Sequence, residues 1–449
     1  MRPNYPKSSL FSLCWLLLLF VAPSCVVQRL DRTPYQQTSY YTQTLKGLQE
    51  QQPATMADTL QAGWAKVNIT PEVGTPMAGY GKRRGMKYNQ VHDSVWVRTF
   101  AFDNGKSQTY FVALDMLIAP MEITAALEQK YAAHGLRPEQ VYLTATHTHT
   151  SFGGWGKKLA GRIMAGKYKK RVVQQTTEKI LQSIKLAQAN LQPTRFGYGS
   201  INAASWVSNR LTGSEAARDT LLRFLKFEQA SGSTAILCTF AAHPTILPSM
   251  QPILSRDYPG ALVYALEQKY DFAAFSAGAV ASHRAVYHHG DSFESVQETG
   301  QALAQLILAA VPAVKTAYTS RLGSSRLPLY LPEPQWRIGD NHRFAPGLFY
   351  TLFGRYPAYL SSLQLGNTIM LGMPADYSGE FMSELEQQAK EQEQHLLVTG
   401  FNGGYLGYII PDEHYKLKKY EARAMNFYGP HSGSYLQEVL RRMIGLYRP

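Results

Sequence analysis

The sequence predicts a mixed α/β fold in which one large mixed sheet is flanked by helices. The chain has 449 residues, of which 45% are hydrophobic and 17% charged, so it can bury a large core and is not disordered. From about Trp64 to the C-terminus, strand-like runs alternate with helix-like stretches, without an internal repeat or a low-complexity linker. Although this length would also suit two or three domains, we expect one domain over residues 62–449.

Short apolar runs, rich in β-branched and aromatic residues, predict the strands. The expected strands are Tyr110 to Met116, Val141 to Thr146, Leu222 to Phe227, Thr234 to Phe240 and Thr368 to Met373. Longer stretches between them predict helices. The expected helices are Pro120 to His134 with Gly135 as its C-cap, Val172 to Leu191, Pro259 to Tyr270, Glu294 to Ala310, Gly379 to Glu393 and Tyr435 to Leu446.

Residues 1–25 have the pattern of a secretory signal peptide. Arg2 and Lys7 precede an uncharged, largely apolar run that contains Ala22-Pro23-Ser24-Cys25. The small residue before Cys25 resembles the lipobox of bacterial lipoproteins, in which the cysteine becomes lipidated. We expect an exported protein, either a membrane-anchored lipoprotein or a periplasmic or secreted one, and a membrane-spanning anchor is the alternative.

Residues 26–61 are expected to form a flexible tether, because this segment is rich in Gln, Thr and Tyr and lacks an apolar period.

Three cysteines, Cys14, Cys25 and Cys238, are too few for a disulfide framework. The net charge of +13 suits an anionic membrane, an acidic substrate or nucleic acid. We expect no nucleic-acid partner, because no recognition motif accompanies the charge and the chain carries an export signal.

The first candidate for chemistry is Thr146-His147-Thr148-His149, which follows an expected strand. In an extended chain, side chains two residues apart point to the same face. His147 and His149 could therefore bind one metal ion, or one could bind while the other handles protons. A pair of hydrogen-bonded structural histidines is the alternative.

Two further polar side chains follow expected strands. His243 comes after the apolar run Ile236 to Phe240 and is followed by Pro244, which ends the strand. Asp376 follows the run Thr368 to Met373 and offers a hard oxygen ligand. A structural histidine and a turn aspartate are the alternatives. Asp257, at a polar turn that enters a helix, could cap that helix, support a metal-bound histidine or contact substrate.

A fourth region, Asn402 to Tyr415, is rich in glycine and tyrosine. Glycines let the backbone approach a ligand, and tyrosine hydroxyls can donate to an oxyanion or bind a metal.

Together, these regions resemble the neutral (alkaline, non-lysosomal) ceramidase family, in order from about Trp64 to Tyr435. The motifs that carry the resemblance are Val67-Asn68-Ile69-Thr70-Pro71, Gly79-Tyr80, His92-Asp93, Thr146-His147-Thr148-His149, Asn209-Arg210, His243-Pro244-Thr245, Asp257, Pro374-Ala375-Asp376, Gly407-Tyr408, Tyr420-Glu421-Ala422 and Tyr428-Gly429-Pro430-His431.

The resemblance implies a zinc-dependent amidohydrolase that cleaves the amide bond of ceramide or a related N-acyl lipid. The zinc ligands that it implies are His147, His243, Asp376 and Tyr408. Catalytic roles fall on His149 and Tyr420, which would stabilise an oxyanion and pass a proton to the leaving amine. A further role falls on Ser282, the hydroxyl nearest to the serine that contacts the reacting centre in the family. The expected substrate contacts are Asn209, Arg210 and Asp257.

Three features depart from the family's pattern. The family usually has Glu where this chain has Asp376, and its Gly-Asp-Val-Ser-Pro string is here Gly278-Ala279-Val280-Ala281-Ser282-His283, with Ser282 one place out of register. We also expect no C-terminal β-domain after Pro449. Two alternatives therefore stay open: an exported zinc hydrolase of a different amide or ester, and a catalytically inactive surface binding protein.

Residues 157–171 carry seven basic side chains and no acidic one, with Leu159, Ile163 and Met164 between them. A basic amphipathic segment so close to the histidine motif could rest on an anionic membrane and pass lipid to the site. A solvated surface helix is the alternative.

Overall fold

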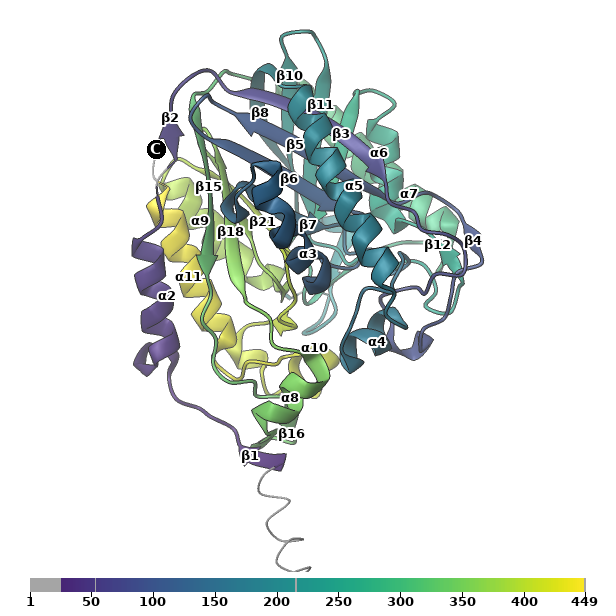
Figure 1. The fold of residues 1–449 in the computed structure, drawn as a ribbon, viewed down its shortest axis with the longest axis vertical. Helices are drawn as coiled ribbons and strands as arrows, with labels where there is room; N and C mark the ends of the chain where they lie inside the picture. Colours follow the sequence, from purple (N-terminus) through teal and green to yellow (C-terminus); the bar gives the residue numbers. More distant parts are fainter. Residues whose placement is uncertain (1–25, 53, 215, 448–449) are drawn as a thin grey trace, which may run out of the picture.

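Two sheets packed face to face form the centre of the protein, and helices cover their outer faces (Figure 1). The computed structural model describes residues 26–52, 54–214 and 216–447. The expected signal peptide therefore lies outside the described residues. Within them, no helix combines the length and apolar character that crossing a membrane requires.

The larger sheet has eight strands in the order β13-β11-β10-β8-β3-β5-β6-β7. It is mixed, because β6 pairs with β7 and β11 with β13 in parallel, whereas the other pairs are antiparallel. The strands are β3 (Gln61–Asn68), β5 (Trp96–Asp103), β6 (Gln108–Leu114), β7 (Val141–Ala145), β8 (Gln192–Asn202), β10 (Leu221–Gln229), β11 (Thr234–Phe240) and β13 (Phe272–Ala277).

The second sheet has five strands in the order β2-β15-β18-β19-β21. Its strands are β2 (Thr55–Met56), β15 (Arg321–Pro328), β18 (Tyr359–Leu365), β19 (Thr368–Gly372) and β21 (His395–Thr399). Shorter paired strands lie in the loops: β1 (Val27–Arg29), β4 (Gln90–Val91), β9 (Val207–Asn209), β12 (Ile253–Leu254), β14 (His283–Ala285), β16 (Arg337–Ile338), β17 (His342–Phe344), β20 (Asp376–Tyr377) and β22 (Tyr408–Ile409).

The helices form the outer layers. They are α2 (Ser39–Gln49), α3 (Met121–Tyr131), α4 (Leu159–Ala165), α5 (Lys170–Ala189), α6 (Asp257–Leu266), α7 (Phe293–Ala310), α8 (Pro346–Phe353), α9 (Met382–Glu391), α10 (Tyr420–Arg423) and α11 (Ser432–Leu446). α3 and α5 share one apolar core with the larger sheet, α6 and α7 share another with it, and α9 and α11 pack on the second sheet.

Strand β5 shows why the strands of the larger sheet are mostly apolar and do not alternate between apolar and polar residues. Successive side chains point to opposite faces: Phe100 and Phe102 enter the core between the sheets, whereas Val97 and Ala101 face α5. Both faces of the sheet are covered, so neither needs polar residues. This arrangement confirms the expected α/β class, and the second sheet is an addition to the single large sheet that we expected.

The segment expected as a flexible tether, residues 26–61, contains regular structure instead. Thr38 caps α2, and the Thr44 hydroxyl lies 2.7 Å from that of Tyr435 on α11. The hydroxyls of Tyr35 and Tyr41 donate to the Glu438 carboxylate at 2.8 and 2.7 Å. The tyrosines that made the segment resemble a polar spacer are thus the groups that attach it to α11.

Candidate active site

The candidate site lies where strand ends from both sheets meet. β7 and β11 of the larger sheet lead into the loops that carry His147 and His243, and β19 of the second sheet leads to Asp376. The pairing of β20 with β22 places Asp376 directly opposite Tyr408. All four residues that the sequence singled out as metal ligands therefore come together.

His147 is held in one orientation by its backbone and its ring. Its φ of +61° is rare for a residue with a side chain, and its ring stacks on Phe401 at a centroid distance of 3.7 Å. The ring Nδ1–H donates to the Leu117 carbonyl at 2.6 Å. Nε2 is thereby left as an acceptor that faces the centre of the site.

His243 is oriented in the same way. Its Nδ1 lies 2.9 Å from the carbonyl oxygens of both Val280 and His283, which can only accept, so Nδ1 carries the proton. Nε2 is then free of hydrogen and lies 3.1 Å from Oδ1 of Asp376 and 3.4 Å from the Tyr408 hydroxyl.

Asp376 supplies a buried oxygen that lacks a donor. Oδ2 accepts a hydrogen bond from the Tyr405 hydroxyl at 2.7 Å. Among the described residues, Oδ1 has no hydrogen-bond partner, although it lies 3.6 Å from Nε2 of His147 and 3.1 Å from Nε2 of His243. Burial raises the pKa of this carboxyl, and a cation held between its oxygen and the two histidine lone pairs would stabilise the ionised form.

The protonation states of the histidines agree with a cation at this position. Burial lowers the pKa of His147 to about 3 and lowers the pKa of His149 and His243 well below the usual range, so these imidazoles are neutral near pH 7. Neutral imidazoles and a carboxylate oxygen are the donors that bind divalent transition metals. The residues present therefore fit a divalent metal ion.

His149 belongs to the same cluster but is held differently. Its Nε2 lies 3.1 Å from Nε2 of His147, and metal-binding atoms of His147, His149 and His243 all lie within 4.8 Å of one another. Within the described structure, its Nδ1 is buried without a partner. Metal-bound histidines usually donate their other ring nitrogen to a fixed acceptor, and His149 lacks this support.

The backbone around His149 is closely packed. A Cβ atom on Gly79, whose φ is +117°, would lie 2.9 Å from Cβ of His149, so only glycine fits there. The buried Arg83 guanidinium donates to the carbonyl of His149, and the Tyr80 ring lies 4.9 Å from the imidazole. The sequence singled out Gly79-Tyr80 but gave no signal for Arg83.

A second polar group borders the metal position. Arg210 Nη2 donates to the Tyr408 hydroxyl at 3.1 Å, and its Nε donates to Glu421 at 2.8 Å. Tyr420 is 53% exposed, and its ring lies 5.9 Å from that of Tyr408. Arg210 and Tyr420 thus both reach the site, whereas Glu421 and Tyr405 are contributors to which the sequence assigned no role.

A cavity of about 1000 Å³ opens over these residues. His147, His149, His243, Asp376 and Tyr408 form part of its wall. The rest of the wall is largely apolar, with many aromatic residues that include Trp155, Phe349, Tyr350, Phe353, Phe427 and Tyr428. A volume at the upper end of the usual range for small-molecule sites, with few polar groups, suits a large apolar ligand.

Three residues expected at the site do not line this cavity among the described residues. The Ser282 hydroxyl is buried 3.0 Å from that of Ser378. The Asn209 side chain bonds to the backbone of its own loop. The Asp257 carboxylate accepts three backbone N–H groups, one of them from the residue after it. Their catalytic and substrate-binding roles stay predictions.

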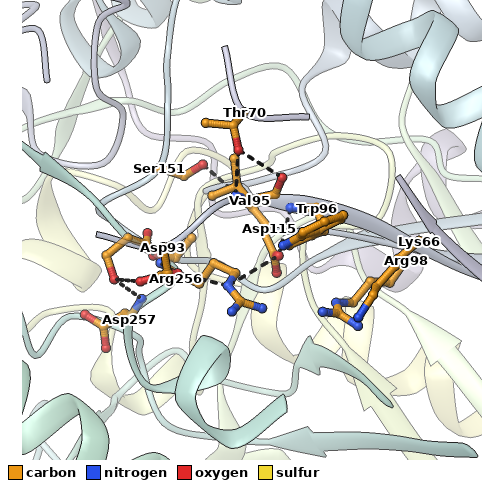
Figure 2. A network of polar contacts seen from close by, with 12 residues as sticks. Lys66, Thr70, Asp93, Val95, Trp96, Arg98, Asp115, Ser151, Arg256 and Asp257 are labelled. Atoms are coloured by element: carbon orange, nitrogen blue, oxygen red, sulfur yellow. Dashed lines mark hydrogen bonds and ion pairs between the residues drawn. The ribbon is translucent and has the colours of Figure 1, made fainter. Parts of the chain in front are cut away.

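A polar network that includes Asp93 and Arg256 (Figure 2) is connected to the histidine loop through Ser255. Asp93 accepts hydrogen bonds from Ser255 Oγ at 2.8 Å and from both N and Nε of Arg256 at 2.9 Å. The Ser255 carbonyl in turn accepts the hydroxyls of Thr148 and Thr150, on either side of His149. Asp93 therefore positions the loop without touching the cavity.

Comparison with known proteins identifies the family of this chain. The family model described as neutral/alkaline non-lysosomal ceramidase, N-terminal, matches residues 60–292. This chain belongs to that family. The family resemblance expected from the sequence is thereby confirmed.

Two kinds of relative extend the comparison. Neutral ceramidase from Pseudomonas aeruginosa is 28% identical over 221 residues, which are 45% of this chain and 32% of the relative. The matched stretch thus spans about a third of that relative's length. The crystal structure of the Pseudomonas aeruginosa enzyme superposes with a TM-score of 0.74 at 19% identity, covering 87% of this chain and 75% of that one. A ceramidase complexed with C2 gives the same TM-score over 86% of this chain and 75% of that one.

Proposed function

We propose that this member of the neutral/alkaline ceramidase family is a zinc-dependent amidohydrolase that cleaves the amide bond of ceramide or a related N-acyl lipid. The observation that carries the proposal is the unpartnered Oδ1 of Asp376, which faces Nε2 of His147 and His243 in the wall of an aromatic cavity.

The proposed zinc ligands are His147, His243, Asp376 and Tyr408. Both histidines have Nδ1 bonded to carbonyl oxygens, which supports Nε2 as the ligand atom of each. When bound, zinc would polarise the amide carbonyl and provide a water molecule acidic enough to attack near neutral pH.

His149 is proposed to move the proton. Its Nδ1 is unpartnered in the described structure, and its Nε2 lies 3.1 Å from Nε2 of His147. No carbonyl or carboxylate therefore fixes its tautomer, and the ring can accept a proton on one nitrogen and release it from the other. The neutral state that burial favours leaves it able to accept. A general base of this kind contributes about 100-fold to 10,000-fold.

Tyr420 and Arg210 are proposed to act on charge that develops at the amide. Tyr420 has a hydroxyl at the cavity wall, and such a donor can stabilise an oxyanion. Arg210 keeps the Tyr408 hydroxyl in place, and its positive charge stays in the site because Glu421 bonds to it.

The cavity supports a lipid as the substrate. Its largely apolar wall would bury an acyl chain at about 25 cal/mol per Å² of apolar surface removed from water. A bound acyl chain would displace water from the reacting amide, which would strengthen the polar contacts of the histidines and tyrosines.

One observation favours a second candidate, a zinc hydrolase of a different amide or ester. Ser282, the hydroxyl nearest to the serine that contacts the reacting centre in the family, is buried against Ser378 and does not line the cavity among the described residues. A substrate whose polar head needs no contact from that serine would be handled equally well.

A substrate panel separates these candidates. N-acyl sphingoid, N-acyl amino acid and simple ester substrates would be offered to the full chain, with His147→Ala as the blank. Preferential release of fatty acid from the N-acyl sphingoid supports the proposal, and preference for another class supports the second candidate. Equal turnover by both proteins would show that the metal mechanism is wrong, and no turnover of any class by either would indicate a binding protein.

We also propose that the chain is exported and held at a membrane through its N-terminus. The proposal rests on the pattern of residues 1–25 alone, and Cys25 is the residue proposed to carry the lipid. Incorporation of labelled palmitate into the wild-type chain, and its loss in Cys25→Ser, would support it.

A further inference from the structure

Exposed cations lie on and beside α4, a helix that lines part of the cavity. Lys157 and Lys158 precede α4, Arg162 lies on it, and Lys167 and Lys170 follow it; all are exposed. No ion pair involves any of them in the part of the chain that the structure describes. Surface cations are normally interspersed with acids, so this group forms a strongly positive patch.

The same helix exposes apolar side chains. Leu159 is 53% and Ile163 49% exposed, and residues four apart share one face of a helix. Two exposed tyrosines, Tyr330 and Tyr420, line the cavity. Exposed aliphatic residues flanked by lysine and arginine are what a helix presents when it lies in the interface of a membrane.

This patch borders the entrance to the active site. Ala160, Gly161 and Met164 of α4 line one part of the cavity, and residues of α8, such as Phe349 and Phe353, line another. α4 packs against α8. A lipid that leaves a bilayer beneath these helices would reach the cavity without crossing water.

The first described residues of the chain pack next to α8. The carbonyl of Val26 accepts the N–H of Ala345 at 2.8 Å, and α8 begins at the next residue, Pro346. β1 pairs with β17, which immediately precedes α8. Figure 1 shows β1, α8 and α4 at the same lower end of the molecule. An anchor at Cys25 would therefore hold the bilayer next to the cavity mouth.

We propose that the surface formed by residues 157–170 docks on an anionic phospholipid bilayer and feeds lipid to the cavity. The inference rests on the proposed function, because it names where that site collects its substrate. The cations would face lipid phosphates, while Leu159 and Ile163 would enter the region of the acyl chains.

Vesicle binding by the full chain tests the proposal. Sucrose-loaded vesicles of phosphatidylcholine alone, or with 30% phosphatidylglycerol, would be sedimented with wild type and with the fourfold variant Lys157→Gln/Arg162→Gln/Lys167→Gln/Lys170→Gln. Each cation near an anionic surface changes binding about fivefold. We expect the wild-type preference for anionic vesicles to fall at least tenfold in the variant, and to disappear for wild type in high salt.

Two controls make the result specific. Lys185→Gln/Lys269→Gln/Lys315→Gln/Lys390→Gln removes the same charge from exposed positions elsewhere and should keep the anionic preference. Leu159→Ser/Ile163→Ser should weaken vesicle binding while leaving binding to heparin, a soluble polyanion, unchanged. Equal losses in both lysine variants, an unchanged fourfold variant, or no effect of the apolar change would each overturn the proposal.

Hydrolysis separates this proposal from the proposed function. On a detergent-dispersed short-chain N-acyl substrate, the fourfold variant should match wild type, whereas on substrate embedded in anionic vesicles it should be at least tenfold slower. Inactivity of wild type in both assays would contradict the proposed function, while the sedimentation result would still decide the docking surface.

Discussion

Nε2 of His243 lies 3.1 Å from Oδ1 of Asp376, although the two residues follow strands of different sheets. Nε2 of His243 carries no hydrogen, because the proton of this ring is on Nδ1 and burial keeps the imidazole neutral. Oδ1 of Asp376 has no hydrogen-bond partner among the described residues. Two acceptors this close in a dry interior repel each other unless a cation lies between them. The two sheets therefore meet at the proposed metal site, and the packing of one sheet against the other positions its ligands.

Removing the charge of Asp376 should release the metal. We expect Asp376→Asn to weaken metal binding by more than the roughly 100-fold that loss of an outer partner costs, as measured by competition with a chromogenic chelator. Asp58→Asn, at an exposed position, is the control. Unchanged affinity in Asp376→Asn would remove this carboxylate from the ligand set.

His149 should be needed for catalysis and not for metal binding. We expect His149→Ala to keep its zinc content while kcat falls about 100-fold to 10,000-fold, because Nδ1 of His149 lacks the fixed acceptor that supports a ligand. Metal analysis and steady-state kinetics, with the exposed His134→Ala as the control, would check both. Loss of zinc from His149→Ala would make this residue a ligand instead.

Asp93 should stabilise the protein in a pH-dependent way. Burial acts to raise the pKa of Asp93, but His92, Ser255 and Arg256 outweigh it, so the pKa lies below 3.8. A lowered pKa contributes stability above the unfolded value, and this stability is lost as the pH falls through the folded value.

We therefore expect Asp93→Asn to lose about 2–3 kcal/mol of unfolding free energy at pH 7 and less at pH 3, as measured by urea denaturation. The variant should also lower kcat, since Ser255 and the His149 loop depend on this carboxylate. An equal loss at both pH values would contradict the assignment.

Helix α2 should contribute to stability, contrary to a flexible tether. Leu48 is only 5% exposed and packs in the core beneath α11, so Leu48→Ala should cost about 2–3 kcal/mol in thermal or urea unfolding. Gln43→Ala, on the exposed side of the same helix, should cost little. Indistinguishable variants would mean that α2 is detached in solution.

Much of the fold follows from the pattern of apolar residues. The expected strand Thr234 to Phe240 matches β11, and Glu294 to Ala310 differs from α7 by one residue. Gly135 has the positive φ, +68°, of a helix C-cap, as expected. These elements are decided by neighbouring residues, which is the information that a sequence displays directly.

The strands β3 and β5 and the helix α2 were missed for a different reason. Their side chains are set by partners far along the chain: Phe100 of β5 meets residues of both sheets, and Tyr35 and Tyr41 meet Glu438. Such contacts leave no local period, and tyrosine in a glutamine-rich segment suggests a spacer until its partner is known.

The residues that meet at the candidate site were easier to predict than the residues that hold them in place. Strand ends indicated His147, His243 and Asp376, because polar groups at these positions meet at the edges of sheets. Tyr405 and Arg83 carried no such signal, since their roles depend on loops that approach from elsewhere. Ser282 is the hydroxyl nearest to the family's serine position, one place out of register, but a φ of +67° and its bond to Ser378 turn its hydroxyl into the interior.

The metal content of the purified full-length chain tests the central claim most directly. Elemental analysis should find about one equivalent of zinc per wild-type chain, as a single closed site requires, and almost none in His243→Ala. Treatment with a chelator should remove the zinc and the hydrolase activity together, and added zinc should restore both. Full activity in a metal-free chain, or undiminished zinc in His243→Ala, would contradict the account.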